Sequence, residues 1–341
     1  MTNRQWTLAR HPDGAGDIDC FAYREAPTPD GAPGQILVQW ELLLCAPTIR
    51  NWISGNRNSY YPTVEIGEVI LAPAIGRIVE SDRSDFPVGQ RVWGIGSWQD
   101  YQWIDPAEGF QIIPEEFSSA DAMGVYGLNA LTGYCGLIRY GRPQEGETLL
   151  VSGAAGSVGS IVAQIGSIKG CKVVGIAGGR EKLDWLRDDC GIEHLIDYKA
   201  DDVGARIDEY FPDGVDIYFD NVGGEILELA AAHMRPMGRI VLCGQIASYD
   251  DGRPIVAPPL DMMRIIYGEI SINGFLITRQ GDLIPQALTD LQGWNEQGLL
   301  SHREDVRPGM REVPQTFSAL FTGANTGTLL ARISSREGEI L

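Results

Sequence analysis

Lysine is scarce in this chain of 341 residues: it has four, and all of them lie between Lys169 and Lys199. Acidic residues outnumber basic ones, with 46 Asp and Glu against 27 Lys and Arg, so the formal net charge is −19. Nucleic acids and anionic membrane surfaces are bound through clusters of Lys and Arg. The charge balance therefore argues against both as partners.

The sequence also lacks long apolar runs and the usual signs of secretion. No segment approaches the length of a membrane span, and the N-terminal residues have no apolar core of the kind found in signal peptides. We therefore expect a cytoplasmic protein without a membrane partner. Because 44 % of the residues are hydrophobic and 21 % are charged, the chain can bury a large core, which at this length predicts two domains.

Metal ligands at useful spacings are missing as well. The six Cys lie far apart and form no CxxC pair, and the four His offer no pair four residues apart. A zinc site needs such side chains converging on one point. We therefore expect no bound metal, and we expect the cysteines to be reduced and mostly packed in the interior.

Apolar stretches rich in β-branched and aromatic residues, broken by Pro and Gly, fill the first part of the chain and predict a barrel-like β-domain. Strands and helices alternate from residue 148 to 276, which predicts a doubly wound parallel sheet of six strands, the last at 271–276. A helix at 314–323 and a strand at 328–333 are expected to return to the first domain. The predicted class is thus α/β, with domains 1–127 (completed by 300–341) and 128–299.

The most informative stretch is 148–159, where a short apolar run changes into small residues and then into a helix. The small residues form an AxGxxG pattern. Backbone N–H groups and the positive end of a helix dipole can approach a dinucleotide pyrophosphate there, because no side chain stands in the way. A Gly-rich turn that serves only strand-to-helix packing is the alternative. The residues that we predict to bind the cofactor here are Ala154, Gly156, Ser157, Val158 and Gly159.

The second strand of the predicted sheet covers 172–177. The residues after its end indicate which of the two nicotinamide dinucleotides binds. Enzymes that bind NAD usually place an acid there for the ribose 2′-hydroxyl, whereas those that bind NADP replace the acid by cations. This chain continues with Gly178 and Gly179 and then offers Lys182. We predict that Lys182 and Tyr198, at the end of the third strand, contact a 2′-phosphate.

Other charged residues near this strand have a simpler interpretation. Glu181 falls on the first turn of the next helix, where an acid favours the helix N-terminus. Lys169 and Lys172 are expected to be solvated surface residues.

Taken in order along nearly the whole chain, these and further motifs resemble the medium-chain dehydrogenases/reductases. Within them the chain is similar to the zinc-independent leukotriene/prostaglandin reductase branch, which includes 2-alkenal and curcumin reductases. The motifs that carry the resemblance are Ile66-Gly67-Glu68-Val69, Leu131-Thr132-Gly133-Tyr134, Ala154 to Gly159, Gly178 to Lys182 with Tyr198, Asp220 to Gly224, Gly238 to Gly244, Asn273-Gly274-Phe275 and Gly323 to Gly327.

The resemblance implies a GroES-like catalytic domain, a Rossmann domain that binds NADP(H), and reduction of a carbon–carbon double bond conjugated to a carbonyl group. Zinc-dependent relatives carry Gly-His-Glu where this chain has Ile66-Gly67-Glu68, so the expected zinc-binding His is missing. Without a Lewis acid, hydride transfer to an isolated carbonyl has little electrophilic help. This favours conjugate reduction over alcohol dehydrogenation.

In the mechanism that we expect, hydride adds to the β-carbon of an enone or enal and the resulting enolate is stabilised by hydroxyl donors. Tyr249 matches the family's tyrosine beside the nicotinamide and is the first candidate donor; Tyr60 is the second. The alternative for both is a packing role at the pocket rim.

The resemblance also implies further cofactor contacts, each of which has a structural alternative. Thr132 could instead bond its own helix backbone, Asn221 and Asn325 could serve as turn residues, and Phe275 could be a buried strand aromatic. The remaining contacts that the resemblance implies are Cys243, chiefly through its backbone, and Gly244.

The departures from the family pattern lie beside the expected pocket and leave the substrate open. Trp52, in Arg50-Asn51-Trp52-Ile53, either narrows the pocket or fills the barrel core, and Leu128-Asn129-Ala130 replaces the family's Met-Pro-Gly. Two other functions stay possible: an NADPH:quinone oxidoreductase and a non-catalytic NADPH-binding protein. The family also implies a homodimer that pairs the sixth strands, here 271–276.

Overall fold

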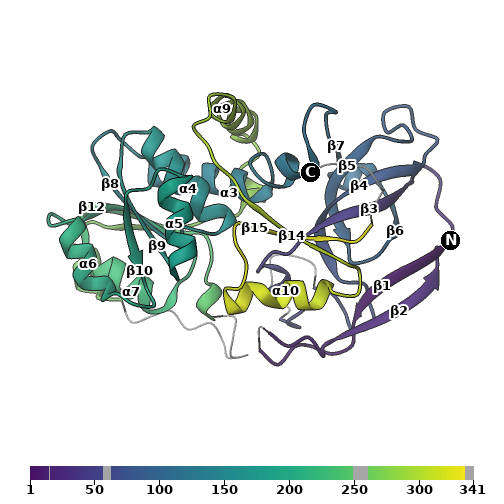
Figure 1. Cartoon of the computed structure of the whole chain (residues 1–341), viewed down its shortest axis with the longest axis horizontal. Helices are drawn as coiled ribbons and strands as arrows, with labels where there is room; N and C mark the ends of the chain where they lie inside the picture. The colour runs from purple at the N-terminus through teal and green to yellow at the C-terminus, as the bar shows by residue number, and fades with distance from the viewer. Residues whose placement is uncertain (15, 57–62, 249–259, 335–341) are drawn as a thin grey trace. The chain divides into compact units, whose positions relative to one another are not determined.

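The computed structural model describes residues 1–14, 16–56, 63–248 and 260–334 (Figure 1). The chain forms two compact units. Unit 1 consists of residues Met1–Met123 together with the C-terminal segment from Glu304, and unit 2 runs from Gly124 to Arg303 apart from a short stretch near residue 250.

Unit 1 is built mainly from β-strands. Its larger sheet has the order β14-β15-β3-β4-β5-β7, with β6 pairing β3, and β1 and β2 form a separate antiparallel pair. The strands are β1 (Thr2–Leu8), β2 (Phe21–Pro27), β3 (Ile36–Leu44), β4 (Leu71–Glu80), β5 (Arg91–Ser97), β6 (Tyr101–Ile104), β7 (Gln111–Ile112), β14 (Glu304–Pro308) and β15 (Thr328–Arg332). The helices are α1 (Ile49–Trp52), the 3-10 turn Pro106–Glu108, α2 (Ser119–Met123) and α10 (Val313–Thr322).

Large aromatic side chains fill the core of unit 1. Trp40 and Trp98 are fully buried, and the ring of Phe317, from α10, lies 5.6 Å from the ring of Trp98. Trp52 is 3 % exposed and belongs to the same core cluster. Of the two roles expected for Trp52, the structure therefore shows the one of filling the core.

Unit 2 is a parallel six-stranded sheet with the order β10-β9-β8-β11-β12-β13, the doubly wound arrangement expected from the sequence. Its strands are β8 (Thr148–Ser152), β9 (Lys172–Ala177), β10 (His194–Asp197), β11 (Val215–Asp220), β12 (Met234–Leu242) and β13 (Ser271–Gly274). Its helices are α3 (Leu128–Gly136), the π-helical turn Leu137–Gly141, α4 (Ser157–Ile168), α5 (Arg180–Asp188), α6 (Val203–Tyr210), α7 (Gly224–Ala232), α8 (Met262–Tyr267) and α9 (Ile284–Glu296), with 3-10 turns at Ile246–Ser248 and Ile277–Arg279.

Alternate residues of these strands pack into two different cores, because successive side chains of a strand point to opposite faces of a sheet. On one face, Val151 and Phe219 pack with residues of α3, α4, α5 and α9. On the other face, Leu150 and Tyr218 pack with residues of α6 and α7. Both faces of the sheet are therefore covered, and its carboxyl edge is left to bind a ligand.

Several elements differ from the sequence-based expectation at their ends. Helix α4 stops at Ile168, whereas the apolar pattern after Ser157 predicts a helix up to Gly170; the positive φ of 81° at Gly170 is incompatible with a continued helix. Strand β13 ends at Gly274 instead of Leu276. The first part of the chain also contains the short helices α1 and α2.

Candidate cofactor-binding site

The turn between β8 and α4 brings a helix N-terminus close to the end of a strand. Gly156 caps α4 with an extended backbone, and Gly153 takes a positive φ of 58°. A Cβ atom on Gly159 would lie 2.3 Å from the carbonyl oxygen of Gly153, so only glycine fits at that position. The turn is therefore as tight as the AxGxxG pattern predicts, and phosphate binding by the first amides of α4 stays a prediction.

Side chains around this turn are held by bonds within unit 2. Asn129 Nδ2 donates to Ser157 Oγ at 2.7 Å, and Ala154 is fully buried. The hydroxyl of Thr132 donates to the carbonyl oxygen of Leu128 at 2.7 Å, which is the helix-bonding role considered from the sequence. Its oxygen keeps lone pairs that a ligand could use, so a cofactor role for Thr132 stays a prediction.

Three strand ends meet beside the turn, where the sheet order places β8, β11 and β12 next to one another. Asn221, which follows β11, donates from Nδ2 to the carbonyl oxygen of Ser152 at 2.8 Å. A Cβ atom on Gly244 would lie 3.1 Å from the carbonyl oxygen of Asn221. Asn221, Cys243 and Gly244 are thus brought together with the phosphate turn, at the edge where ligands enter such sheets.

The Cys243 side chain is a protonated thiol and therefore a poor nucleophile. Burial raises its pKa to about 12, and the charge of Asp220 contributes to the same shift. The thiol is therefore protonated at physiological pH. This agrees with the expectation that Cys243 acts chiefly through its backbone.

The opposite end of the edge, beyond β9, carries Tyr198 and Lys199 beside the predicted cation Lys182. A Cβ atom on Gly178 would lie 2.5 Å from Cε1 of Tyr198 and 2.9 Å from Cε of Lys199, so both side chains cross this backbone. Lys199 Nζ lies 5.9 Å from the centre of the Tyr198 ring. Gly179 has a φ of 92°, and its N–H donates to Asp197 Oδ1 at 3.1 Å.

Lys182 is half-buried beside this group. Burial lowers its pKa, and the nearby charge of Lys199 lowers it further. An anion bound near Lys182 would favour its charged form. Glu181 instead forms an exposed ion pair with Arg303 at 3.3 Å.

The other two lysines have structural roles. Lys169 Nζ lies 5.3 Å from the ring centre of Trp294, and Lys172 Nζ lies 5.6 Å from that of Phe211. Neither is part of the group around Tyr198.

Two predicted cofactor residues show local packing. The Phe275 ring lies 5.7 Å from the ring of Tyr140, and a Cβ atom on Gly136 would be only 2.4 Å from its Cζ atom. Asn325, in unit 1, donates from Nδ2 to the carbonyl oxygen of Gly327 at 3.3 Å. Asn325 thus shows the turn role considered from the sequence, whereas Phe275 is only partly buried and follows the end of β13, so it is not a buried strand aromatic. Contacts of both residues with a cofactor stay predictions.

Tyr60 and Tyr249, the predicted hydroxyl donors, lie outside the described residues.

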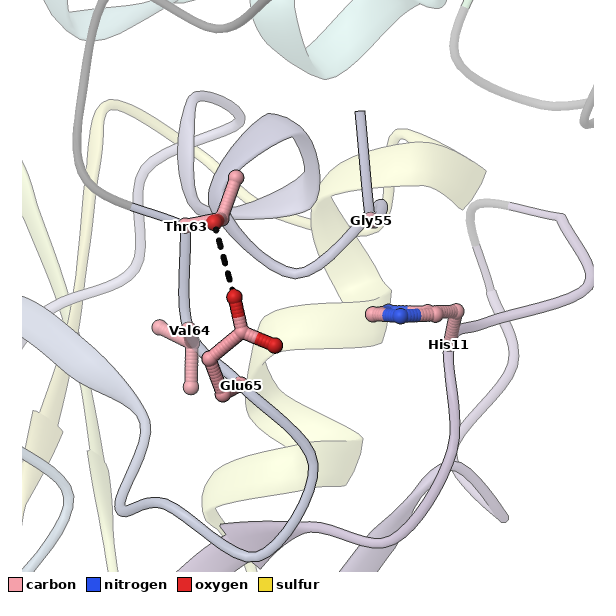
Figure 2. Close-up of a pocket in the computed structure, with 5 residues that line it drawn as sticks. All are labelled: His11, Gly55, Thr63, Val64 and Glu65. Atoms are coloured by element: carbon pink, nitrogen blue, oxygen red, sulfur yellow. Dashed lines mark hydrogen bonds between the residues drawn. The ribbon is translucent and has the colours of Figure 1, made fainter. Parts of the chain in front are cut away.

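Unit 1 has a pocket of about 160 Å³ between residues 11 and 65 (Figure 2). His11 lies opposite Thr63 and Val64, and the Thr63 hydroxyl lies 3.5 Å from Glu65 Oε1. The pocket is smaller than the roughly 300–1,000 Å³ of most small-molecule sites, so we assign it no substrate.

Two features are absent from the described ranges. In residues 1–14, 16–56, 63–248 and 260–334, no three His, Cys, Asp or Glu side chains gather in a way that could hold a metal ion. Over the same ranges, no helix is long and apolar enough to cross a membrane.

Three residues that matter here received no role from the sequence. Asp197 accepts a hydrogen bond from the Gly179 amide, and Lys199 places a second cation beside Tyr198. Asp220 accepts hydrogen bonds from several groups at the end of β11. Only the run Asp220 to Gly224 and the clustering of the lysines pointed to them. Their contacts join segments distant in sequence, which a linear pattern does not show.

The sheet of unit 2 is doubly wound, a glycine turn lies at its carboxyl edge, and cations lie beyond β9. Together these features define a dinucleotide-dependent oxidoreductase. Two family models match the chain: an N-terminal domain of oxidoreductase over residues 4–113, and a zinc-binding dehydrogenase over residues 157–292. The NADPH-dependent curcumin reductase of Escherichia coli is 34 % identical, covering 97 % of each chain.

Further relatives agree over most of the length. The NADP(+)-dependent 2-alkenal reductase of Nicotiana tabacum is 32 % identical, covering 90 % of this chain and 89 % of the relative. CurA from Vibrio vulnificus, solved in complex with NADPH, superposes with a TM-score of 0.92 at 33 % identity, covering 98 % of this chain and all of that one. The chain belongs to the medium-chain dehydrogenase/reductase superfamily, in the branch of the curcumin and 2-alkenal reductases.

Proposed function

We propose that this protein is an NADPH-dependent reductase of carbon–carbon double bonds conjugated to a carbonyl group. The observation that carries the proposal is the group formed by Lys182, Tyr198 and Lys199 at the adenosine end of the sheet edge. Full-length similarity to reductases whose names include 2-alkenal and curcumin supports the substrate class. Both names denote conjugated carbonyl compounds.

The 2′-phosphate would bind to this group. Lys182 and Lys199 supply charge, and the Tyr198 hydroxyl supplies a hydrogen bond, while Glu181 is engaged with Arg303. The bare backbone of Gly178 and Gly179 lets the ribose approach. NADH lacks the phosphate that Lys182 and Lys199 would attract, which favours NADPH over NADH.

The remaining predicted cofactor residues follow the edge of the sheet. The amides at the start of α4, from Gly156 to Gly159, would hold the pyrophosphate. The nicotinamide half would then reach the switch point between β8 and β11. The residues that we propose for that half are Thr132, Asn221, Cys243, Gly244, Phe275 and Asn325.

The bound cofactor supplies a hydride to the β-carbon of the substrate. The protein's task is to stabilise the negative charge that develops on the carbonyl oxygen and to protonate the α-carbon. We propose Tyr249 as the first hydroxyl donor and Tyr60 as the second, on the resemblance alone. A Tyr249→Phe variant that turns over an enal at the wild-type rate would remove Tyr249 from this role.

The assay of the whole proposal follows NADPH loss by absorbance with three substrate classes: an enal, an enone and a benzoquinone. We expect the enal or the enone to be reduced faster than the quinone. Equal or faster quinone reduction would favour the quinone oxidoreductase alternative. Tight NADPH binding with no oxidation above background would favour the non-catalytic alternative.

We also propose a homodimer formed through β13, the strand at one end of the six-stranded sheet. Exposed apolar side chains gather along α8 and its neighbours; Tyr267 is 79 % exposed and Ile266 is 60 % exposed. An open strand edge beside such a patch favours pairing with a second copy. Light scattering after gel filtration should give twice the chain mass, and Ile266→Lys should shift the protein toward the monomer.

A further inference from the structure

Asp220 is a fully buried carboxylate at the end of β11, in the middle of the sheet. Its Oδ1 atom accepts hydrogen bonds from Ser152 Oγ at 2.9 Å and from the Tyr218 hydroxyl at 2.6 Å. Its two oxygens also accept from the Gly223 amide, at 3.0 and 3.1 Å, and Oδ1 accepts from the Val222 amide at 3.1 Å. Burying a carboxylate is costly unless such bonds compensate for lost water, so the site is strongly constrained.

The strand register brings the three side chains together. Leu150 of β8 pairs with Tyr218 of β11. Ser152 and Asp220 each lie two residues further along their strands, so they are neighbours on the same face of the sheet. Burial raises the pKa of Tyr218 well above its ordinary value, as does the charge of Asp220. The tyrosine therefore stays a hydrogen-bond donor.

Ser152 connects this buried carboxylate to the loop beyond β11. A serine hydroxyl has one proton and two lone pairs. Its proton is directed to Asp220, so its oxygen accepts the N–H of Asn221, at 2.9 Å. The carbonyl oxygen of Ser152 accepts from Asn221 Nδ2 at 2.8 Å, which fixes the direction in which the amide group faces.

The backbone of Asp220 extends the same connection to β12. Its carbonyl oxygen accepts the amides of Cys243, at 2.8 Å, and Gly244, at 3.1 Å. One residue thus links the ends of β8, β11 and β12. These are the ends from which the proposed nicotinamide-side contacts extend.

We propose that Asp220 and Ser152 are positioning residues: through the Ser152 hydroxyl they hold Asn221 and the phosphate turn in the arrangement that binds NADPH. The proposal rests on the proposed function, because it assumes that Asn221 contacts the cofactor. Tyr218 bonds the same carboxylate oxygen and also contacts the Ser152 side chain, but it has no bond to the loop among the described contacts. It therefore serves as a matched control.

The test compares Ser152→Ala with Tyr218→Phe. Each variant removes one hydroxyl from Asp220 Oδ1, so both should lower the melting temperature of the ligand-free protein. Only Ser152→Ala also removes the acceptor of the Asn221 amide. We expect it to raise the NADPH dissociation constant about tenfold, the effect of losing one hydrogen bond in the binding arrangement, and Tyr218→Phe to change it less than about twofold. The dissociation constants would be measured by calorimetry at a temperature where both variants are folded.

Equal changes of affinity in the two variants, or no change in Ser152→Ala, would contradict the proposal. Ser152→Thr keeps the hydroxyl and should restore the wild-type dissociation constant even if its added methyl group lowers the melting temperature. If Ser152→Ala does not fold, hydrogen exchange in the wild-type protein decides. The Asn221 and Gly223 amides should then exchange as slowly as those of β11, and exchange at the rate of open loops would overturn the proposal.

The wild-type protein separates this inference from the proposed function. If it fails to bind NADPH, the proposed function fails. If it binds NADPH and reduces an enal but the two variants do not differ, only the positioning role of Ser152 and Asp220 fails.

Discussion

The two ends of the cofactor edge in unit 2 are built differently. At the adenosine end, Tyr198 is 48 % exposed, and the charge of Lys199 contributes to the lowered pKa of Lys182. At the switch point, Asp220 and Ser152 are fully buried and joined by hydrogen bonds. The first end can adjust to a ligand, whereas the second is fixed before a ligand arrives.

The difference separates selectivity from positioning. Lysine charges at a partly exposed surface can distinguish two cofactors that differ by one phosphate. In the ligand-free protein, water hydrates these charges until the phosphate binds. A buried network has no such freedom, but it can hold backbone amides and one side chain in place. The turn before α4 serves both cofactors, whereas changes at the adenosine end should affect mainly the preference for NADPH.

The largest effect is expected from Gly159→Ala. The new Cβ atom would lie 2.3 Å from the Gly153 carbonyl oxygen, so the turn or the helix start must move. NADPH and NADH affinity should both fall, by roughly a hundredfold or more, because both share the pyrophosphate. Titration calorimetry would measure this. Gly281→Ala is the control, since a Cβ atom there meets nothing within 4 Å, and wild-type-like binding by Gly159→Ala would refute this reading of the turn.

A smaller effect is expected from pH. In the ligand-free protein the pKa of Lys182 is lowered from 10.5 by burial and by Lys199. A bound phosphate favours the charged lysine and raises that pKa again, so binding takes up a proton. NADPH affinity should therefore fall as the pH rises through the lowered pKa, beginning below 10.5.

The same titration includes its own controls. NADH affinity should not follow this pH dependence, because it lacks the 2′-phosphate. Lys182→Met should flatten the curve for NADPH. An unchanged curve in that variant would assign the effect to another group.

The smallest effect is expected from Glu181→Gln. The Glu181 and Arg303 side chains are 73 % and 40 % exposed, and exposed ion pairs contribute only about 0–1 kcal/mol. The melting temperature and the NADPH dissociation constant should stay close to those of the wild type. A tenfold loss of NADH affinity or gain of NADPH affinity would show that Glu181 faces the ribose.

Much of the fold could be predicted from the sequence because its signals are local. The apolar run 172–177 has the bounds of β9, and the glycine turn after Ser152 begins the expected helix. Strands β2 and β14 could not be predicted, because β2 is mostly exposed and β14 is the polar run Glu304–Pro308, so neither shows an apolar pattern. Their pairing partners, and not their own residues, make them strands.

The parts of the candidate site whose residues lie in one short segment could be predicted from the sequence. Gly178, Gly179 and Lys182 follow one strand and were identified together. Asp220 and Ser152 lie 68 residues apart in the chain, and only the parallel pairing of β8 with β11 joins them. A role for a buried carboxylate in such a pair could not be read from either segment alone.

The central claim is that the cations beside Tyr198 select NADPH, and one comparison of dissociation constants tests it most directly. NADPH and NADH would be titrated into the wild-type protein, Lys182→Ala and the control Lys169→Ala. We predict that Lys182→Ala weakens NADPH binding roughly tenfold to a hundredfold, as expected for a lost charge-assisted bond, and leaves NADH binding and the control unchanged. A wild-type protein that binds both cofactors equally, or a Lys182→Ala variant with unaltered preference, would contradict the claim.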